Sequence, residues 1–356
     1  MKLAYDLSIL RHPPAGTAVY ARELLRAMVD AGSGDRIIPT SGWPRVARGG
    51  LLRRGANLAV DVGWLTLGSA AVAARNHVDA WYSPANVLPT NIRRPMVVTI
   101  HDVNFLAIDG HYDRGFALYA ERAFRGSARR AAAVLTISEF SRGQLIERLG
   151  VPADRITVAY PGIDHALRVE PAPPDPALPD RYALFVGQTE PHKNIGLLVD
   201  AWRTGRIPDG LHLIVAGPPG RDDERLREVV TGSPVRDLIH FVGWVDGPRL
   251  ARLYENATCF LFPSLAEGFG LPPLEAMARG IPTAVADRAS LPEVTADGAV
   301  RFDAHDPAAL AALVERLCDD EEVRRRLSKE GRRVSERYRW ETTARLAWQV
   351  IRAAVP

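Results

Sequence analysis

Two glutamates flank a short uncharged turn in the segment SLAEGFGLPPLEAMARG (residues 264–280). Seven residues separate Glu267 from Glu275, and they include two glycines and two prolines. The prolines suit the first turn of an α-helix, where no backbone N–H is needed. Glu275 would then lie near the positive end of the helix dipole, where a carboxylate is stabilised. The segment therefore predicts a strand-end loop followed by a short helix, with one carboxylate on each.

The GFG part of this turn is suited to binding an anion. Glycines expose backbone N–H groups with little side-chain bulk, and a helix N-terminus favours a phosphate. Glu275 can accept hydrogen bonds from two vicinal hydroxyls, as the acidic residue of dinucleotide-binding folds does with ribose. Glu267, on the loop, is placed to meet a second hydroxylated ring. We therefore expect a sugar–diphosphate–ribose ligand. The alternative is that Glu275 only caps its helix and Glu267 is a surface carboxylate.

Other chemically versatile side chains also follow strand-like apolar runs. These are His101 and Asp102 after MVVTI, and Glu190, His192 and Lys193 after ALFVG. Ligands of doubly wound sheets bind outside the carboxyl ends of the strands, so a site is expected at these positions. Among 45 basic residues the only other lysines are Lys2 and Lys329. Lys193 is thus a minority choice in a chain that otherwise uses arginine, which draws attention to this position.

The elements that would position these residues alternate between short apolar runs and amphipathic helical patterns. The strand-like runs are KLAYDLSIL, RIIPT, AWYS, MVVTI, AAVLTIS and ITVAY in the first half, and YALFVG, HLIVAG, IHFVGW, CFLFPS, PTAVAD and AVRF in the second. Helical patterns such as TAVYARELLRAMVDAG lie between several of them. This alternation predicts parallel sheets with helices on both faces.

The pattern divides the chain into two doubly wound, Rossmann-like α/β domains facing a central cleft. The first is expected over residues 1–165 and the second over residues 182–338. Residues 166–181 are expected to form a linker, because five prolines in the segment 168–180 exclude a helix or a central strand. Residues 339–356 should form a terminal helix that packs on one domain or across both.

Length and composition are those of a soluble globular protein of about two domains. The chain has 356 residues, 47% of them hydrophobic and 24% charged, with a net charge of +3; single cores rarely exceed roughly 250–300 residues. Cys259 and Cys318 are the only cysteines, which indicates a reducing compartment and no disulfide framework. No signal peptide is evident. The longest apolar run, residues 62–74, is too short to span a bilayer and predicts a buried helix.

A basic stretch in the first half, RVARGGLLRR, has no acidic residue. Its arginines are Arg45, Arg48, Arg53 and Arg54. It has two interpretations: a solvated face, or contact with an anionic membrane surface or an anionic acceptor. We expect a cytoplasmic protein, and a location at the inner face of the plasma membrane stays open.

The pattern EGFGLPPLEAMARGIP resembles the signature of family 4 retaining glycosyltransferases, which have the two-domain B-type glycosyltransferase fold. Further segments resemble those of the family in the same order: PAGTAVYARELL, TIHD, TISEFSR, YPGID, FVGQTEPHKN, IHFVGWVDGPRLARLYENA and ASLPEVTADGAVRFDAHDPAAL. The resemblance covers nearly the whole chain. HDVNFL and ASLPEV are most similar to the mannosyltransferase-like branch, which implies GDP-mannose as the leading donor.

The resemblance implies roles for the matching residues, with acceptor binding by the first domain and nucleotide-sugar binding by the second. Glu275 would hold the ribose hydroxyls. The expected catalytic residues are Glu267 at the donor sugar, Lys193 at the diphosphate leaving group and His101 near the reacting carbon. The other expected donor-binding residues are Gly16, Gly187, Gln188, His192, Val245, Gly268, Phe269, Gly270 and Leu271, and Asp102 is a candidate for acceptor binding.

The implied activity is transfer of a hexose from a nucleoside-diphosphate sugar to a hydroxyl of a glycan or lipid-linked acceptor in polysaccharide biosynthesis, with retention of configuration. Many members have an arginine where this chain has Gln188 or His192, so Lys193 is expected to be the main cation at the diphosphate. No Asp-x-Asp pair follows a strand, so we expect no essential metal. We also expect no other cofactor and no nucleic-acid partner.

Two alternatives to this activity stay open. A glycoside hydrolase or phosphorylase would use Glu267 and Glu275 as an acid/base pair, which needs a fixed separation of the two carboxyl groups. A catalytically inactive scaffold would bind the sugar nucleotide without transferring its sugar.

Overall fold

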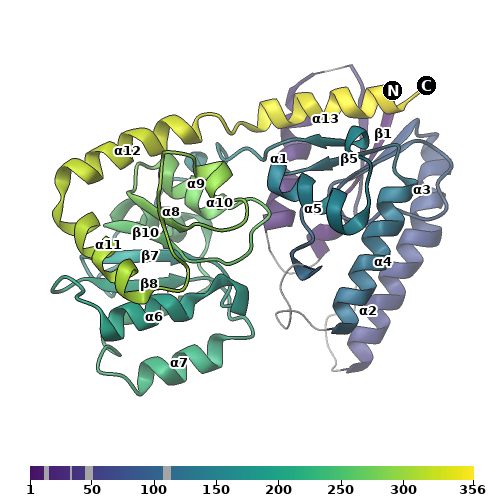
Figure 1. Ribbon diagram of the computed structural model, residues 1–356. Helices are drawn as coiled ribbons and strands as arrows, with labels where there is room; N and C mark the ends of the chain where they lie inside the picture. The colour runs from purple at the N-terminus through teal and green to yellow at the C-terminus, as the bar shows by residue number, and fades with distance from the viewer. Residues whose placement is uncertain (12–15, 33, 45–50, 107–113) are drawn as a thin grey trace. The chain divides into compact units, whose positions relative to one another are not determined.

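The protein is described by a computed structural model over residues 1–11, 16–32, 34–44, 51–106 and 114–356. The chain forms two compact units (Figure 1): residues 1–162 together with residues 339–356, and residues 163–338. Each unit contains its own six-stranded sheet, and all strand pairs in both sheets are parallel. No helix in the described ranges is both long and apolar enough to cross a bilayer.

The first unit has the strand order β2-β1-β3-β4-β5-β6. Its strands are β1 (Lys2–Asp6), β2 (Arg36–Thr40), β3 (Ala80–Ser83), β4 (Met96–Thr99), β5 (Ala133–Thr136) and β6 (Ile156–Val158). Its helices are α1 (Gly16–Asp30), α2 (Leu51–Gly63), the π-helical turn η2 (Trp64–Gly68), α3 (Ser69–Asn76), α4 (Arg114–Arg130), α5 (Glu139–Leu149) and α13 (Trp340–Ala354). The strands β3 and β4 are buried along their whole length, as expected when helices cover both faces of a parallel sheet.

The C-terminal helix α13 belongs to the first unit. It lies along one face of the sheet, while α4 and α5 cover the other (Figure 1). Trp348 of α13 is buried, and its indole N–H donates to the carbonyl of Met28 in α1. Thr343 donates to the carbonyl of Tyr160. Of the two packings that the sequence left open for this helix, the structure groups residues 339–356 with the first unit.

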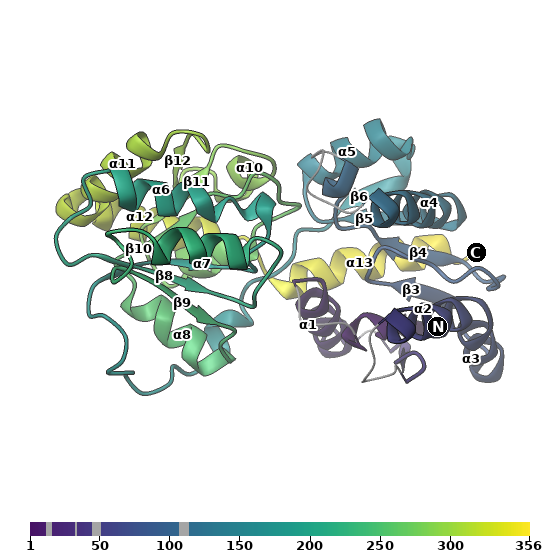
Figure 2. The ribbon, with the colours of Figure 1, turned by 90° about the horizontal axis from the view of Figure 1, so that it is seen from below.

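The second unit has the strand order β12-β11-β10-β7-β8-β9 (Figure 2). Its strands are β7 (Tyr182–Val186), β8 (His212–Ala216), β9 (Ile239–Gly243), β10 (Cys259–Phe262), β11 (Thr283–Ala286) and β12 (Val300–Phe302). Its helices are α6 (Ile195–Thr204), α7 (Asp223–Thr231), α8 (Gly247–Asn256), α9 (Leu271–Ala278), α10 (Leu291–Thr295), α11 (Pro307–Asp319) and α12 (Glu321–Ser335). The order places β10 beside β7, so that the loops after these two strands lie at the same edge of the sheet.

All twelve strand-like runs form strands, and the first strand falls furthest short of its run. The run KLAYDLSIL forms β1 only as far as Asp6. The carboxylate of Asp6 accepts a hydrogen bond from the backbone N–H of Ser8, and the chain turns into the 3-10 helix η1 (Ser8–Arg11). This local bond between side chain and backbone competes with continuation of the strand.

The apolar run at residues 62–74 is helical, but the prediction that it is buried is wrong in part. It spans the end of α2, the turn η2 and most of α3. Trp64 and Ala73 belong to the core of the first unit, whereas Val62 and Leu67 are 46% and 66% exposed. The run is therefore amphipathic, because only one side of these helices meets the sheet.

Residues 166–181 contain no strand and one short 3-10 helix, η5 (Ala166–Arg168). They are held to α8 within the second unit. The backbone N–H of Ala172 donates to the carbonyl of Pro248, and the guanidinium of Arg252 donates to the carbonyl of Ala172. Asp175 forms an ion pair with Arg249 at 2.9 Å.

Candidate functional site

The loops that follow β7 and β10 are joined by hydrogen bonds at the carboxyl edge of the second sheet. The loop after β7 ends in the 3-10 helix η6 (Pro191–Lys193). The carbonyl of His192 in this helix accepts from the backbone N–H of Leu265 at 2.8 Å and from the hydroxyl of Ser264 at 3.2 Å. His192, predicted in the phosphate loop, therefore uses its backbone to join the two loops that carry the predicted site residues.

This joining brings Lys193 and Glu267 into direct contact. Lys193 Nζ lies 2.5 Å from Glu267 Oε1, and the two side chains are only 18% and 14% exposed. The ammonium group also lies 5.4 Å from the ring centroid of Phe262, the last residue of β10. Water is largely excluded from both charges, so their mutual attraction is stronger than that of a surface pair. The sequence placed both residues at strand ends but did not pair them.

The turn between Glu267 and α9 is fixed from inside by Ser290. The hydroxyl of Ser290 contacts the carbonyls of Glu267 and Phe269, each at 2.9 Å. Phe269 is buried and packs edge-on against Tyr338 with ring centroids 5.4 Å apart. Gly270 has a φ of +112°, and a Cβ there would lie 2.9 Å from Leu291. A residue larger than glycine would therefore distort this turn.

Glu275 lies in the second turn of α9, as the fifth of its eight residues, and has two side-chain partners that the sequence analysis missed. The hydroxyl of Tyr254 donates to Oε2 at 3.1 Å, and Nε2 of His165 lies 3.6 Å from Oε1. The Glu275 side chain is 13% exposed. Burial, and then the neighbouring Glu275 carboxylate, raises the pKa of Tyr254 well above its usual value, so this phenol stays a hydrogen-bond donor.

Arg279, a cationic residue, contacts both Tyr254 and the segment that follows His165. One of its side-chain N–H groups donates to the carbonyl of Ala166 at 2.5 Å, and its guanidinium lies 5.1 Å from the ring centroid of Tyr254. These contacts hold the segment that carries His165 close to α9. The proximity of His165 to the YPGID segment was the only sequence signal that could have indicated it.

The predicted phosphate loop packs closely against the loop after β8. A Cβ on Gly217 would lie 2.1 Å from the carbonyl oxygen of Gly187, so the absence of a side chain at Gly217 allows the close approach. The side-chain amide of Gln188 donates to the carbonyl of Pro219 at 3.3 Å. Thr189 is buried, and its hydroxyl accepts from the backbone N–H of Gly220 at 2.6 Å.

Arg221, on the same neighbouring loop, contacts Glu190 at 2.7 Å. In this structure the guanidinium of Arg221 is 46% exposed and engaged with the Glu190 carboxylate. Among the described residues, the ion pair observed for the predicted sugar-binding carboxylate Glu267 is the one with Lys193.

In the first unit, His101 is buried directly beyond the end of β4. Its Nε2 lies 2.8 Å from the carbonyl oxygen of Pro84, and its ring packs edge-on against Tyr20 at 4.7 Å. Burial lowers the pKa of His101 to about 4, although the bond to Pro84 opposes this shift. The imidazole is thus neutral at pH 7. Since a carbonyl can only accept, Nε2 carries the proton and Nδ1 is an acceptor.

The remaining predicted residues lie at the strand ends or helix starts of their own units. Asp102 follows His101 and accepts from the backbone N–H of Asn104 at 3.1 Å. Gly16 is the first residue of α1, and Val245 lies in the loop between β9 and α8. The cleft between the two domains stays a prediction.

The basic stretch RVARGGLLRR reaches into α2. Arg45 and Arg48 lie outside the described residues, and Arg53 and Arg54 lie in α2.

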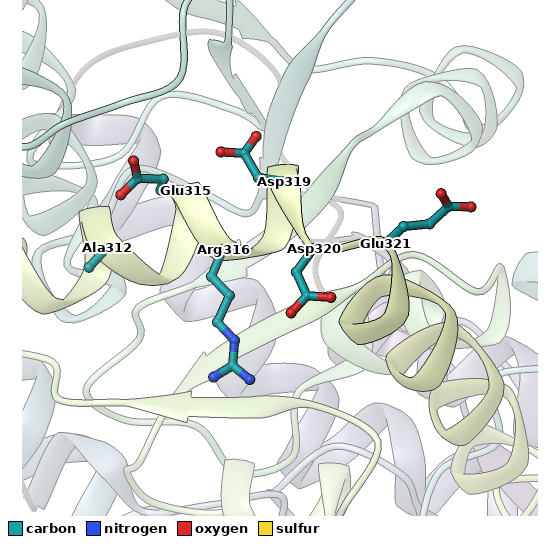
Figure 3. A pocket seen from close by; sticks show the side chains of 6 residues that line it. All are labelled: Ala312, Glu315, Arg316, Asp319, Asp320 and Glu321. Atoms are coloured by element: carbon teal, nitrogen blue, oxygen red, sulfur yellow. The ribbon is translucent and has the colours of Figure 1, made fainter.

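A separate surface pocket of about 600 Å³ lies at the corner between α11 and α12. Its lining residues are Ala312, Glu315, Arg316, Asp319, Asp320 and Glu321. Figure 3 shows the acidic side chains pointing in different directions rather than converging on one point. Within the described ranges, no group of three or more His, Cys, Asp or Glu side chains is arranged to hold a metal ion. The pocket therefore supports no functional assignment.

Two protein families match adjacent parts of the chain. The family described as "Glycosyltransferase Family 4" matches residues 14–167, and the family described as "Glycosyl transferases group 1" matches residues 170–334. An O-antigen chain mannosyltransferase B of Escherichia coli is 32% identical over 283 residues, which cover 76% of this chain and 74% of that protein.

Solved structures with the same fold are more distant in sequence. A sucrose-phosphate synthase from Thermosynechococcus elongatus has a TM-score of 0.79 at 20% identity and covers 99% of this chain and 98% of its own. HepE of Anabaena, in complex with UDP-glucose, has a TM-score of 0.74 at 18% identity and covers 99% of this chain and 100% of its own. These likenesses confirm the predicted fold class of two Rossmann-like domains.

Proposed function

The chain belongs to family 4 of the glycosyltransferases and has their B-type fold, and we propose that it transfers a hexose from a nucleoside-diphosphate sugar to a hydroxyl acceptor. The leading proposal is mannose from GDP-mannose, with a glycan or lipid-linked sugar of polysaccharide assembly as acceptor. The name of the E. coli relative, an O-antigen chain mannosyltransferase, supports mannose as the sugar and a polysaccharide chain as the acceptor.

The observation that carries this proposal is the contact of Lys193 with Glu267 at the carboxyl edge of the second sheet. A nucleoside-diphosphate sugar presents an anionic diphosphate next to a neutral, hydroxyl-rich ring. Lys193 supplies the cation for the first and Glu267 the hydrogen-bond acceptor for the second, within 2.5 Å of each other. Glu275, on the helix that follows, supplies a second carboxylate for the ribose hydroxyls.

In the proposed reaction the acceptor oxygen bonds to the anomeric carbon on the face that the leaving group departs from. The bond between this carbon and the diphosphate oxygen breaks with its electron pair, and the acceptor proton passes to the departing phosphate oxygen. Lys193 stabilises the charge that develops on the diphosphate. His101 is neutral and buried, so it is proposed to contact the donor sugar as a hydrogen-bonding group rather than to act as a base at neutral pH.

We propose that this reaction needs no metal ion and no other cofactor, because Lys193 and the helix N-termini at the site can balance the diphosphate charge. The retaining outcome is checked by the anomeric configuration of the product in NMR spectra. An inverted product would refute the same-face displacement while leaving the donor site intact.

The acceptor is proposed to be reached at the inner face of the plasma membrane. The basic residues of the stretch Arg45–Arg54 and the exposed side chains of Val62 and Leu67 support this location. Sedimentation with vesicles of phosphatidylglycerol, compared with vesicles of phosphatidylcholine, tests it. Equal recovery in the supernatant with both lipids would refute the membrane contact.

The proposed function is tested by a thermal-shift screen against GDP, UDP, ADP and dTDP sugars, followed by a transfer assay with the selected donor. A ligand that binds the folded state raises the unfolding midpoint, so the correct base should stand out. Rapid stoichiometric hydrolysis of the donor without acceptor would favour a hydrolase. Tight donor binding without transfer to any acceptor in a cell extract would favour an inactive scaffold.

A further inference from the structure

The chain contains seven tryptophans, and two of them are exposed. Trp64, Trp81, Trp202, Trp340 and Trp348 are buried, whereas Trp43 and Trp244 are 41% and 63% exposed. Trp43 lies three residues beyond the end of β2, the edge strand of the first sheet. An indole that remains half exposed at the carboxyl edge of a ligand-binding fold calls for an explanation, because burial would stabilise it.

The indole of Trp43 is seated on two glycines of the neighbouring helix. A Cβ on Gly63 would lie 2.6 Å from Cζ3 of Trp43, and a Cβ on Gly68 would lie 3.0 Å from its Cε2. The buried Trp64 packs edge-on against Trp43, with ring centroids 6.5 Å apart. The absence of side chains at Gly63 and Gly68, together with the neighbouring Trp64 ring, thus defines the position of the Trp43 indole. About two-fifths of Trp43 stays exposed.

The π-helical turn η2 (Trp64–Gly68) explains how two glycines five residues apart can serve one ring. In a regular α-helix, residues five apart are separated by roughly 140° around the axis, so Gly63 and Gly68 would point in different directions. Here the backbone N–H of Ser69 bonds to the carbonyl of Trp64, five residues earlier. This wider turn brings residues five apart close to the same side. The irregular turn therefore forms the surface on which Trp43 lies.

The segment that carries Trp43 is also held from its other side. The backbone N–H of Leu7 donates to the carbonyl of Thr40 at 2.7 Å, and the guanidinium of Arg11 donates to the carbonyl of Ser41. A Cβ on Gly42 would lie 3.2 Å from Cβ of Ser8. The three residues before Trp43 are thus held to the segment 7–11, which includes η1, while the Trp43 ring lies against the helical residues Gly63 and Gly68.

We propose that Trp43 is a stacking platform for one pyranose ring of the acceptor, with the ring's C–H face on the indole and its hydroxyls toward Ser8, Arg11 and Ser41. The proposal rests on the proposed function, since it assigns the acceptor to the carboxyl edge of the first sheet. It adds a site and a ligand class: a cyclic hexose with one apolar face.

A sugar fits this arrangement better than a lipid surface. A pyranose needs one flat aromatic face with polar groups within reach. Trp43 offers the exposed ring, and Arg11 of η1 is bonded to the carbonyl of Ser41, two residues before it. Insertion into a membrane is favoured by several apolar side chains on one helix face, which in this region are Val62 and Leu67 rather than Trp43. The fixed position of the indole also reduces the entropy lost when a ligand binds.

The first experiment is fluorine NMR of the full chain labelled with fluorotryptophan, with the Trp43 signal assigned from the Trp43→Phe variant. Titration with methyl α-mannopyranoside should shift the Trp43 signal and leave the five buried tryptophans unchanged. Mannitol, which has hydroxyls but no ring face, is the matched control and should not shift it. No shift with the pyranoside, or an equal shift with mannitol, would overturn the proposal. A shift with phosphatidylglycerol vesicles alone would assign Trp43 to the membrane.

The second experiment uses methyl α-mannopyranoside as the acceptor probe in a transfer assay. Trp43→Ala should raise its KM by roughly 2- to 10-fold, the range expected for one aromatic contact, while the affinity for the donor stays unchanged. Trp43→Phe should recover part of the loss and Trp43→Leu should not, because only Phe keeps an aromatic face. Equal recovery by Leu and Phe would show that the position needs only an apolar side chain.

Two glycine variants distinguish an effect on the Trp43 platform from an effect on helix stability. Gly63→Ala should weaken binding of the pyranoside, because the atoms nearest to the new Cβ all belong to Trp43. Gly143→Ala in α5 is the control, since a Cβ there meets no atom within 4 Å. Both changes favour a helix by a similar amount. If Gly63→Ala and Gly143→Ala change the binding of the pyranoside to the same extent, the contact between Gly63 and Trp43 has no role in binding. If no sugar nucleotide binds, the proposed function fails, yet the fluorine titration still tests the platform.

Discussion

Lys193 Nζ and Glu267 Oε1 lie 2.5 Å apart, so the cation proposed for the diphosphate and the carboxylate proposed for the donor sugar neutralise each other. A donor must therefore replace this contact. The diphosphate can take over the ammonium group, and the sugar hydroxyls can then hydrogen-bond the released carboxylate. A nucleoside diphosphate without a sugar provides only the first of these two replacements.

The first prediction concerns Glu267→Gln. With bare diphosphate bound, the wild-type carboxylate remains near an anion without new hydrogen-bond donors, which costs free energy. The amide removes this repulsion. We expect Glu267→Gln to bind the bare nucleoside diphosphate more tightly than the wild type, by roughly tenfold, while transfer activity falls. Calorimetry with the nucleoside diphosphate measures the affinity, and an unchanged or weaker affinity would show that the ion pair does not discriminate between donor and product.

The second prediction concerns Lys193. The departing diphosphate gains charge as the glycosidic bond breaks, so a nearby cation stabilises the transition state more than the ground state. Lys193→Ala should lower kcat on the order of 10²–10³-fold and change the donor KM less. Lys193→Arg should restore only part of the activity, because a planar fork replaces a point charge. Steady-state kinetics on folded protein measure both constants. A change in KM alone would show that Lys193 binds the ground state and the transition state equally well.

The third prediction concerns Glu275 and its partner Tyr254. Glu275→Gln should weaken binding of the nucleoside diphosphate, because loss of charged hydrogen bonds costs roughly 1.5–3 kcal/mol. Tyr254→Phe removes one neutral donor to Oε2 and should have a smaller effect, since the carboxylate keeps its charge. Calorimetry on both variants gives the comparison. If Glu275→Gln binds as the wild type does, Glu275 is not at the ribose.

The fourth prediction concerns divalent metals. Lys193 is proposed to balance the diphosphate, so EDTA should leave most of the transfer activity intact. Activity is measured after dialysis against EDTA, with and without added magnesium or manganese. Loss of activity that either metal restores would contradict the proposal that Lys193 and the helix N-termini balance the diphosphate charge.

The fifth prediction concerns Asp6, a buried carboxyl at the end of β1. Burial raises its pKa to about 6 from the ordinary value of 3.8, with the Ser8 backbone hydrogen bond opposing the shift. Between these two values the unfolded chain releases the proton and the folded one retains it. The contribution of Asp6 to stability therefore falls as pH rises from about 4 to about 6 and stays low above.

Asp6→Asn should remove this pH dependence, because an amide keeps an acceptor for Ser8 and does not ionise. Relative to the wild type, the variant should gain on the order of 2 kcal/mol at pH 7.5 compared with pH 4. Urea unfolding at the two pH values measures the difference. A constant stability difference between wild type and variant across this pH range would show that ionisation of Asp6 does not destabilise the folded protein.

The candidate site was predictable in its residues but not in its contacts. Glu267, Glu275, Lys193 and His101 were found because each stands at the end of an apolar run or the start of a helix, which local periodicity reveals. Their partners were not found. Tyr254 precedes Glu275 by 21 residues and His165 precedes it by 110, and neither position carries a pattern that would pair it with a carboxylate.

The fold class was more fully predictable, since all twelve strand-like runs form strands. The alternation of apolar runs with amphipathic helices depends on neighbours two to four residues apart, and the sequence records such periods directly. The extent of β1 was predicted wrongly, because a single hydrogen bond from Ser8 to Asp6 ended a run that hydrophobicity alone would continue.

The sequence by itself determined the elements, the two-domain class and the residue types available for chemistry at the strand ends. The tertiary structure alone decided which of those residues meet. Lys193 reaches Glu267 because β7 pairs with β10, although two further strands lie between them along the chain. Trp43 lies on Gly63 and Gly68 because a π-helical turn brings these glycines to one side. Strand order and helix irregularity arise from long-range packing, which no local period encodes.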